Sequence, residues 1–296
     1  MTAASDPAGP EYGSDLRRSQ LVQTIADRLG STREARWIVD HGGAERAVAL
    51  ADRRQAGEPL QYVLGRWPFR HLELRVDPRV LIPRPETEQV VEVALDELGR
   101  AVDASRAPGE TGGRAVDLGT GSGAIALSLA LEGAALAPGL EVWATDVSAE
   151  ALEVARLNVD DLAVENPAAA ARVRLAEGGW FAALPRCLAG RLDLVVSNPP
   201  YVSEAEYPAL DAVVRDWEPR TALVAGPGEG GLGGMAAIQA VVAEARRWLR
   251  PSGALVVEMA PAQATASVDA AHRAGFSQVT TARDLAGRLR ILVARR

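Results

Sequence analysis

Cysteine and histidine are scarce in this sequence, and their scarcity excludes two kinds of site. The 296 residues include one cysteine, Cys187, so the chain can form neither a disulfide framework nor a thiolate metal site of its own. The three histidines, His41, His71 and His272, are too widely spaced along the sequence to form a metal cluster. We therefore predict no metal site, and we expect each histidine to be a surface or packing residue.

The sequence also lacks a long uncharged apolar run and an excess of basic residues. Residues 1–15 contain no apolar core of a signal peptide, and no later stretch is suited to cross a membrane. The net charge of −7 argues mildly against a nucleic-acid partner, although it is compatible with a local basic patch. We therefore predict a cytoplasmic protein with no membrane partner and no direct nucleic-acid binding, and we expect a monomer by default.

The sequence does have the composition of a folded protein and the length of more than one domain. Hydrophobic residues make up 48% and charged residues 24%, and 296 residues favour a main domain with a smaller one. Residues 1–13 are small, polar and contain proline, so we expect them to be disordered. Helical spacing of apolar residues predicts a helical domain over residues 14–57. Its helices are expected at 15–30, 31–42 and 44–54.

A linker and a larger domain are predicted to follow. Short apolar runs at 62–64, 71–76 and 80–82, separated by glycine and proline, predict a β-hairpin linker over residues 58–83. Over residues 84–296 strands and helices alternate, which predicts an α/β, Rossmann-like domain with a doubly wound sheet. The strands are expected at 115–118, 141–145, 173–175, 192–197, 254–259, 277–282 and 288–294. The helices are expected at 122–132, 148–158, 233–249 and 262–274, after one that opens at 83–88.

A glycine-rich turn follows the first strand of this domain. It consists of Gly119, Thr120, Gly121, Ser122 and Gly123. These glycines permit a tight turn and a close approach of a ligand to the backbone, but the loose Gly-x-Gly-x-x-Gly/Ala pattern alone does not separate a nicotinamide cofactor from S-adenosylmethionine. Two observations favour the methyl donor. Asp117 at the strand end can face the ammonium group of the donor, and no pyrophosphate or hydride-handling site is evident.

Two further positions are candidates for the same cofactor site. Asp146 ends the second strand, where a carboxylate can accept hydrogen bonds from both ribose hydroxyls. The alternative is that Asp146 caps the helix that begins near Ser148. Trp180 and Phe181 follow the third strand and can either line an adenine pocket or belong to the core. We predict the ribose role for Asp146, and the residues alone leave Trp180 open.

The fourth strand ends in Asn198-Pro199-Pro200-Tyr201, at the sheet edge where open α/β sheets bind ligands. An amino nitrogen conjugated to a carbonyl or a ring is a poor nucleophile. Two acceptors that hold its two N–H groups turn its lone pair toward the methyl group of the donor and stabilise the developing charge. The side-chain oxygen of Asn198 and the carbonyl of Pro199 fit that task, and Tyr201 offers a ring for a planar acceptor. The alternative is a strand-terminating turn.

Several strings together resemble a known family. The glycine turn followed by Asn198-Pro199-Pro200-Tyr201 is similar to amino-methyltransferases that modify adenine N6, guanine N2 or glutamine N5. Further strings narrow the resemblance to the release factor glutamine methyltransferases, from about residue 15 to 294. These strings are Gly57-Glu58-Pro59-Leu60-Gln61-Tyr62-Val63-Leu64-Gly65, Val80-Leu81-Ile82-Pro83-Arg84-Pro85-Glu86-Thr87-Glu88, Glu218-Pro219, Ala222-Leu223, Gly230-Gly231-Leu232, and Asp284-Leu285-Ala286-Gly287 with Arg290.

The resemblance implies a helical domain, a β-hairpin linker and a seven-stranded methyltransferase domain that uses S-adenosylmethionine. It implies an enzyme that methylates N5 of the glutamine in the Gly-Gly-Gln motif of bacterial class 1 peptide chain release factors, docked with the help of the helical domain. Carried over to this chain, the glycine turn, Asp146, Trp180 and Asn198 contact the donor. Residues 198–201 hold the glutamine.

The sequence departs from the family pattern in two places. Gly179 stands where the family often has an acid before the Trp-Phe pair, so an adenine contact from that acid is absent or comes from Glu177. Glu258 is followed by Met259 and Ala260 where glycine is usual. We therefore assign no role to Glu258. Arg84 and Glu86 can border the active site, or they can simply open the first helix of the larger domain, and the residues leave both alternatives open.

Three other functions compete with this one. An adenine-N6 DNA or guanine-N2 RNA methyltransferase would share the amine-holding chemistry, but it would be expected to add a basic recognition region or base-flipping aromatics. A nicotinamide oxidoreductase is supported by the loose glycine pattern only. A binding module without activity would keep the cofactor fold alone.

Overall fold

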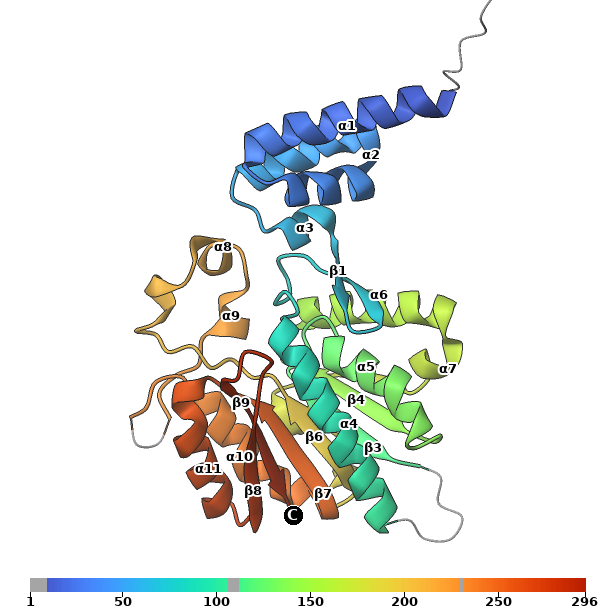
Figure 1. Ribbon diagram of the computed structural model, residues 1–296. Helices are drawn as coiled ribbons and strands as arrows, with labels where there is room; N and C mark the ends of the chain where they lie inside the picture. Colours follow the sequence, from blue (N-terminus) through green and yellow to red (C-terminus); the bar gives the residue numbers. More distant parts are fainter. Residues whose placement is uncertain (1–9, 106–111, 229–230) are drawn as a thin grey trace, which may run out of the picture. The chain divides into compact units, whose positions relative to one another are not determined.

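The structure is a computed structural model that describes residues 10–105, 112–228 and 231–296 (Figure 1). The chain divides into two compact units, Met1–Arg66 and Trp67–Arg296. Most of the predicted disordered segment, residues 1–9, lies outside the described residues, whereas residues 10–13 form the start of the first helix.

The first unit is helical, as predicted. It contains α1 (Pro10–Leu29), α2 (Thr32–Gln55) and α3 (Leu60–Leu64). Ser31 caps α2 by accepting a hydrogen bond from the backbone N–H of Glu34 at 3.2 Å. The two helices predicted at 31–42 and 44–54 are one helix with a kink at Gly43, whose φ of 64° is a left-handed value that interrupts the helical backbone.

The strand predicted at 62–64 is wrong, because this segment is the helix α3. Pro59 stands at its N-cap, and Gly65 ends it in the left-handed conformation with a φ of 74°. These two residues enclose a single helical turn that buries Tyr62 and Val63. The apolar run is therefore explained by burial on one side of a turn and not by strand pairing.

A two-stranded sheet follows, of β1 (Arg66–Phe69), whose first residue is the last of the first unit, and β2 (Leu72–Arg75). β1 includes Pro68, which was predicted to separate strands and not to lie within one. The third strand predicted for this linker, at 80–82, is wrong. Val80 and Ile82 are buried, which explains their apolar character, but the backbone N–H of Ile82 donates to the Glu218 carboxylate at 3.0 Å and not to a neighbouring strand.

The main sheet of the second unit has seven strands in the order β5-β4-β3-β6-β7-β9-β8. The strands β3 to β7 run parallel to one another, whereas β9 runs antiparallel to both β7 and β8. The predicted doubly wound, seven-stranded α/β fold is therefore confirmed. The strands are β3 (Arg114–Leu118), β4 (Glu141–Asp146), β5 (Val173–Glu177), β6 (Leu192–Ser197), β7 (Leu249–Glu258), β8 (Gln278–Arg283) and β9 (Leu289–Arg295).

Helices cover both faces of this sheet (Figure 1). The helices of the unit are α4 (Pro85–Ser105), α5 (Ala124–Glu132), α6 (Ala149–Glu165), α7 (Pro167–Ala170), α8 (Ala212–Arg215), α9 (Arg220–Leu223), α10 (Ala236–Trp248) and α11 (Ala264–Arg273). None of the helices in the described residues is long and apolar enough to span a membrane.

Neighbouring residues of the central strands contribute to two separate cores. On β6, Leu194 and Val196 pack in the cluster that includes α4 and α5, whereas Val195 packs in the cluster that includes α10 and α11. Side chains of a strand alternate between the two faces of the sheet, so a strand buried on both faces is apolar at nearly every position. This explains why β6 is mainly apolar and buried at all six positions. The carboxyl ends of β3, β4 and β6 lie at one edge of the sheet, because β3 pairs in parallel with both β4 and β6.

Candidate active site

The glycine turn between β3 and α5 is fixed to the end of the neighbouring strand. The backbone N–H groups of Gly119 and Thr120 both donate to the carbonyl of Thr145, at 2.8 and 2.9 Å. Gly119 and Gly121 have φ values of 73° and 55°, a conformation that favours glycine. The turn therefore presents backbone at the carboxyl edge of the sheet, as predicted.

Asp146 joins this turn to the end of β4. Its Oδ2 accepts from the backbone N–H of Gly121 and its Oδ1 from that of Ser148, each at 2.9 Å. Ser148, and not Asp146, is the N-cap of α6, where its hydroxyl accepts from the N–H of Ala151 at 3.1 Å. A carboxylate oxygen accepts more than one hydrogen bond, so Asp146 keeps acceptor capacity toward the cavity beside it.

A cavity of about 320 Å³ lies against the turn, and a smaller one of about 50 Å³ adjoins it. Asn198 lines both cavities, together with Leu81 and the two turn glycines Gly119 and Gly121. The larger cavity is also lined by Asp146, Val147, Gly178, Gly179, Trp180, Pro200, Thr221 and Ala222. The smaller one is also lined by Pro83, Arg84, Thr87, Thr120, Ser122, Ala124 and Ile125. Asn198 thus stands where the two spaces meet.

The two adjacent aromatic residues after β5 have different environments. Trp180 lines the larger cavity, and a side chain at Gly119 would lie 3.6 Å from its ring. Phe181 is buried in the core, where its ring stacks on Trp248 with centroids 5.6 Å apart. The sequence left open whether this pair belongs to a pocket or to the core, and the structure divides it between the two.

Asp117 lies beneath the glycine turn and is fully buried. Its Oδ2 accepts from the Thr120 hydroxyl at 2.6 Å and from the backbone N–H of Ala126 at 3.1 Å, whereas its Oδ1 has no partner among the described residues. Burial raises the pKa of Asp117 to about 7, against the opposing effect of the Thr120 hydrogen bond. Asp117 is not among the residues that line either cavity, so its contact with a donor ammonium group stays a prediction.

Residues 198–201 leave the end of β6 at the same edge. Asn198 and Pro200 border the larger cavity, whereas Pro199 is buried and is not among the lining residues. The Asn198 side-chain N–H donates to the Thr87 hydroxyl at 3.2 Å. The hydroxyl of Tyr201 donates to Glu258 at 3.2 Å, and burial together with that carboxylate raises the pKa of Tyr201.

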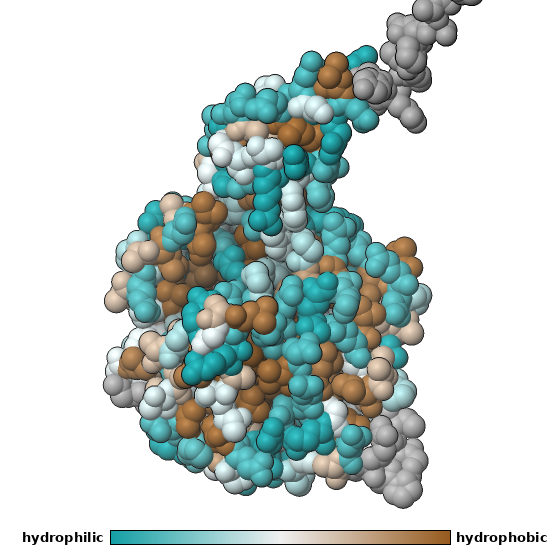
Figure 2. Space-filling view, viewed as in Figure 1, coloured by the Kyte–Doolittle hydropathy of each residue, from teal (hydrophilic) through white to brown (hydrophobic). Residues whose placement is uncertain are grey.

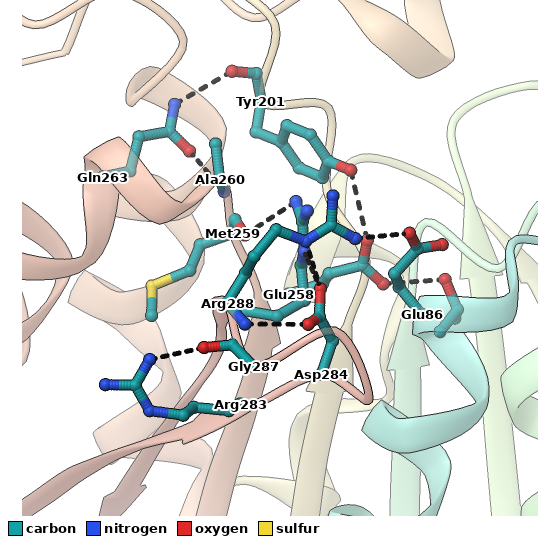
Figure 3. Close-up of polar contacts among 12 residues, drawn as sticks. Glu86, Tyr201, Glu258, Met259, Ala260, Gln263, Arg283, Asp284, Gly287 and Arg288 are labelled. Carbon is teal, nitrogen blue, oxygen red and sulfur yellow. Dashed lines mark hydrogen bonds and ion pairs between the residues drawn. The ribbon is translucent and has the colours of Figure 1, made fainter.

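Glu258, to which the sequence assigned no role, belongs to this site. It ends β7, is buried, and accepts from Thr87 as well as from Tyr201 (Figure 3). Gln263 is a second residue that was missed, since its side-chain N–H groups hold the Tyr201 carbonyl at 2.9 Å. Thr87 occurs in one of the strings that resemble the family, but no local pattern connects it with Asn198 or Glu258.

Arg84 and Glu218 form an ion pair that was also missed. The Glu218 carboxylate is buried and accepts from both the Arg84 guanidinium and the backbone N–H of Ile82. The pair connects the segment before α4 with the segment that holds α8 and α9. Both residues lie in strings that resemble the family, but they are 134 positions apart, so spacing gave no sign of the pairing.

The sequence and the structure are both similar to those of known methyltransferases. The family model "Methyltransferase small domain" matches residues 97–216. The release factor glutamine methyltransferase of Bifidobacterium longum is 40% identical over 284 residues, which cover 95% of this chain and 88% of that protein. The protein of the same name from Gloeobacter violaceus is 41% identical over 251 residues, covering 84% and 79%.

Among solved structures, the hMettl16 catalytic domain in complex with the MAT2A 3′UTR hairpin 6 matches with a TM-score of 0.53. The match covers 86% of this chain and 81% of that chain at 16% identity. At this identity the likeness concerns the fold alone.

Proposed function

Because this chain belongs to the release factor glutamine methyltransferase family, we propose that it transfers a methyl group from S-adenosylmethionine to a release factor. The acceptor atom is N5 of the glutamine in the Gly-Gly-Gln motif of bacterial class 1 release factors. The observation that carries the proposal is the position of Asn198, which lines both the larger and the smaller cavity at the end of β6.

The residues around the larger cavity fit the methyl donor. Asp146 is a carboxylate at a strand end with acceptor capacity for ribose hydroxyls, and Trp180 offers a ring face for the adenine. The glycine turn would hold the amino-acid part of the donor near the smaller cavity, with Asp117 beneath it. When bound, the donor supplies an electrophilic methyl group on a sulfonium.

The chain's own residues would prepare the acceptor nitrogen. The Asn198 side-chain oxygen and the Pro199 carbonyl would accept the two N–H groups of the glutamine amide, so that its lone pair turns out of conjugation and toward the methyl group. Tyr201, tied to Glu258 through its hydroxyl, would pack its ring on the planar amide. No strong base is required, because the proton leaves after the transfer.

A protein acceptor agrees with the surface beside the cavity. Apolar residues gather on the segment that carries α8 and α9 in Figure 2, and Thr221 and Ala222 of α9 line the cavity itself. The net charge of −7 gives no support to a nucleic-acid substrate, and the adenine or guanine alternative is not favoured by the relatives. We also propose a cytoplasmic location and a monomeric state.

Transfer of a labelled methyl group tests the proposal. The purified chain is mixed with labelled S-adenosylmethionine and a class 1 release factor, with the same factor carrying Ala in place of the Gly-Gly-Gln glutamine as a control and duplex DNA as a second control. We expect label on the intact release factor alone. An enzyme that binds the donor but leaves this glutamine unlabelled would contradict the proposal.

A further inference from the structure

A chain of buried side chains connects Asn198 to the end of a different strand. The Asn198 side-chain N–H donates to the Thr87 hydroxyl at 3.2 Å, and that hydroxyl donates to Glu258 Oε2 at 2.7 Å. The other carboxylate oxygen, Oε1, accepts from the Tyr201 hydroxyl at 3.2 Å, and in Figure 3 Tyr201 and Glu258 point toward one another. Thr87 and Glu258 are 5% and 1% exposed, so water does not substitute for these contacts.

With Glu258 ionised, the order of donors and acceptors in this chain has one solution. An ionised carboxylate only accepts, so Glu258 requires a proton from each hydroxyl that contacts it. The single proton of the Thr87 hydroxyl is then directed at Glu258, and its oxygen can only accept from Asn198. Asn198 must therefore present its NH₂ group to Thr87, and its Oδ1 is turned the other way.

We propose that Thr87 and Glu258 are positioning residues that fix the side-chain amide of Asn198 with Oδ1 toward the acceptor. This inference rests on the proposed function, in which that oxygen accepts an N–H of the substrate amide. The opposite orientation would place an NH₂ group against the substrate NH₂, so that no hydrogen bond forms and the lone pair of the acceptor is not released. Among the described contacts of the Asn198 side chain, the hydrogen bond to Thr87 is the one that distinguishes the two orientations of its amide group.

The placement of Glu258 also explains why a carboxylate is buried there. Burial raises the pKa of Glu258, while the hydrogen bonds from Thr87 and Tyr201 and the charge of Arg290 oppose that rise. A buried carboxylate costs stability unless it is fully hydrogen-bonded, so a purely structural position would be better served by an apolar residue. Here one carboxylate orients both Asn198, through Thr87, and Tyr201.

A pair of substitutions at Thr87 separates the effect of its hydroxyl group from the effect of its packing. Thr87→Val keeps the shape and removes the hydroxyl, and Thr87→Ser keeps the hydroxyl and removes a methyl group. We expect Thr87→Val to lower kcat about tenfold with the donor Kd nearly unchanged. Thr87→Ser, which keeps the hydroxyl, should have a kcat close to that of the unchanged protein. Thr265→Val, at an exposed position of α11, is the matched control and should leave both values unchanged. Equal loss in Thr87→Val and Thr87→Ser, or no loss in Thr87→Val, would overturn the proposal.

Glu258→Gln is a second variant that changes the same contacts from the other end. Glutamine offers one acceptor oxygen where Glu258 offers two, so one of the two hydroxyls of Thr87 and Tyr201 must face an NH₂ group. We expect kcat to fall here as well, with melting temperature and donor Kd close to those of the unchanged protein. Unchanged kcat in a folded Glu258→Gln variant would contradict the role given to this carboxylate.

A measurement on the side chain itself keeps this test separate from the proposed function. The sequence has three asparagines, Asn158, Asn166 and Asn198, so selective ¹⁵N labelling gives three side-chain amide signals, and the signal absent from Asn198→Ala identifies the third. We expect one Nδ2 proton of Asn198 to be shifted by its hydrogen bond in the unchanged protein and in Thr87→Ser, but not in Thr87→Val. If the unchanged protein transfers no methyl group, the proposed function fails, and this signal still decides the orientation of Asn198.

Discussion

The parts of the site that we propose to hold the donor and the acceptor, called here the donor side and the acceptor side, are built in different ways. The donor side, made of residues 119–123 with Asp146 and Trp180, is held by backbone groups of neighbouring loops, such as the Gly121 N–H on Asp146 at 2.9 Å. The acceptor side, made of Asn198, Tyr201, Thr87 and Glu258, is held by side chains from α4, β7 and the loop after β6. Its contacts connect residues 111, 171 and 57 positions apart.

This difference has a consequence for what each side tolerates. A backbone contact survives many side-chain substitutions, so the donor side depends on a few special residues, the glycines and Asp146. A network of side chains loses its order when any member is replaced, because the remaining buried groups are left without partners. We therefore expect substitutions on the acceptor side to reduce the transfer step, and those on the donor side to reduce donor affinity.

The largest expected effect is on the acceptor side. Asn198→Ala removes an acceptor for the substrate amide, and we expect the transfer rate to fall by about 10²–10³-fold because the developing charge on nitrogen loses its stabilisation. Calorimetry with S-adenosylmethionine should show much smaller losses in donor binding, since Asp146 and the glycine turn are unchanged. Near-normal turnover in Asn198→Ala would contradict the assignment of Asn198 to the transfer step.

The matching substitution on the donor side is Asp146→Ala. It removes the carboxylate that accepts from the backbone N–H groups of Gly121 and Ser148, and that would also hold the ribose. We expect the donor Kd to rise about tenfold or more, with kcat at saturating donor little changed. Asp146→Asn keeps one acceptor oxygen and should be intermediate. A loss confined to kcat would contradict the assignment of Asp146 to the donor side.

The adjacent aromatics allow a smaller and more selective test. Trp180→Ala should weaken donor binding several-fold with little change in melting temperature, because the half-buried ring lines the cavity. Phe181→Ala should lower the free energy of unfolding by about 3–5 kcal/mol, because it leaves a cavity beside Trp248, while the folded fraction still binds the donor. Chemical denaturation and calorimetry on both variants check this contrast, which fails if the two effects are exchanged.

The smallest effect on the transfer rate is expected for a substitution at Asp117, which should change the stability of the protein and not its turnover. Its pKa is raised from 3.8 to about 7 by burial, so the folded protein holds a proton that the unfolded chain releases between those values. The contribution of this group to stability is full below about pH 4 and is lost as the pH rises through about 7. That loss amounts to a few kcal/mol.

Asp117→Asn removes this titration. From pH 4 to pH 8 the free energy of unfolding of the unchanged protein should fall relative to that of Asp117→Asn. Denaturant titration of both proteins at each pH measures this difference. A difference that does not vary with pH would show that Asp117 is ionised in the folded protein throughout this range.

Much of the fold was predictable, because the central strands β3, β6 and β7 are buried along most of their length. Mainly apolar runs such as Leu192–Val196, which Asp193 interrupts, are typical of such strands, and the turns between strands and helices carry glycine and proline. Two of the errors lie at 62–64 and 80–82, where short apolar runs are also typical of buried turns. In both places the backbone conformation was predicted wrongly, since so few residues do not show a period, and the apolar character of Tyr62, Val63, Val80 and Ile82 is explained by their burial.

The candidate site was predictable to the same extent, and for a related reason. The glycine turn, Asp146 and residues 198–201 each stand at a strand end, so their types and positions along the chain indicated a common edge. Trp180 could not be separated from Phe181, because adjacent aromatics differ only in which one faces the cavity. Glu258 was assigned no role because Met259 and Ala260 follow it where glycine is usual. No local pattern indicated its partners Thr87 and Tyr201, which lie on other elements.

The sequence by itself determined the order of elements, the sheet edge at which ligands bind and the chemistry available there, because these follow from local patterns of burial and from residue type. Only the tertiary structure placed Thr87 and Glu258 behind Asn198, since that contact requires α4 and β7 to pack beside β6. The direction of a side-chain amide depends on which donor or acceptor lies next to it, and no local pattern in the chain records that neighbour.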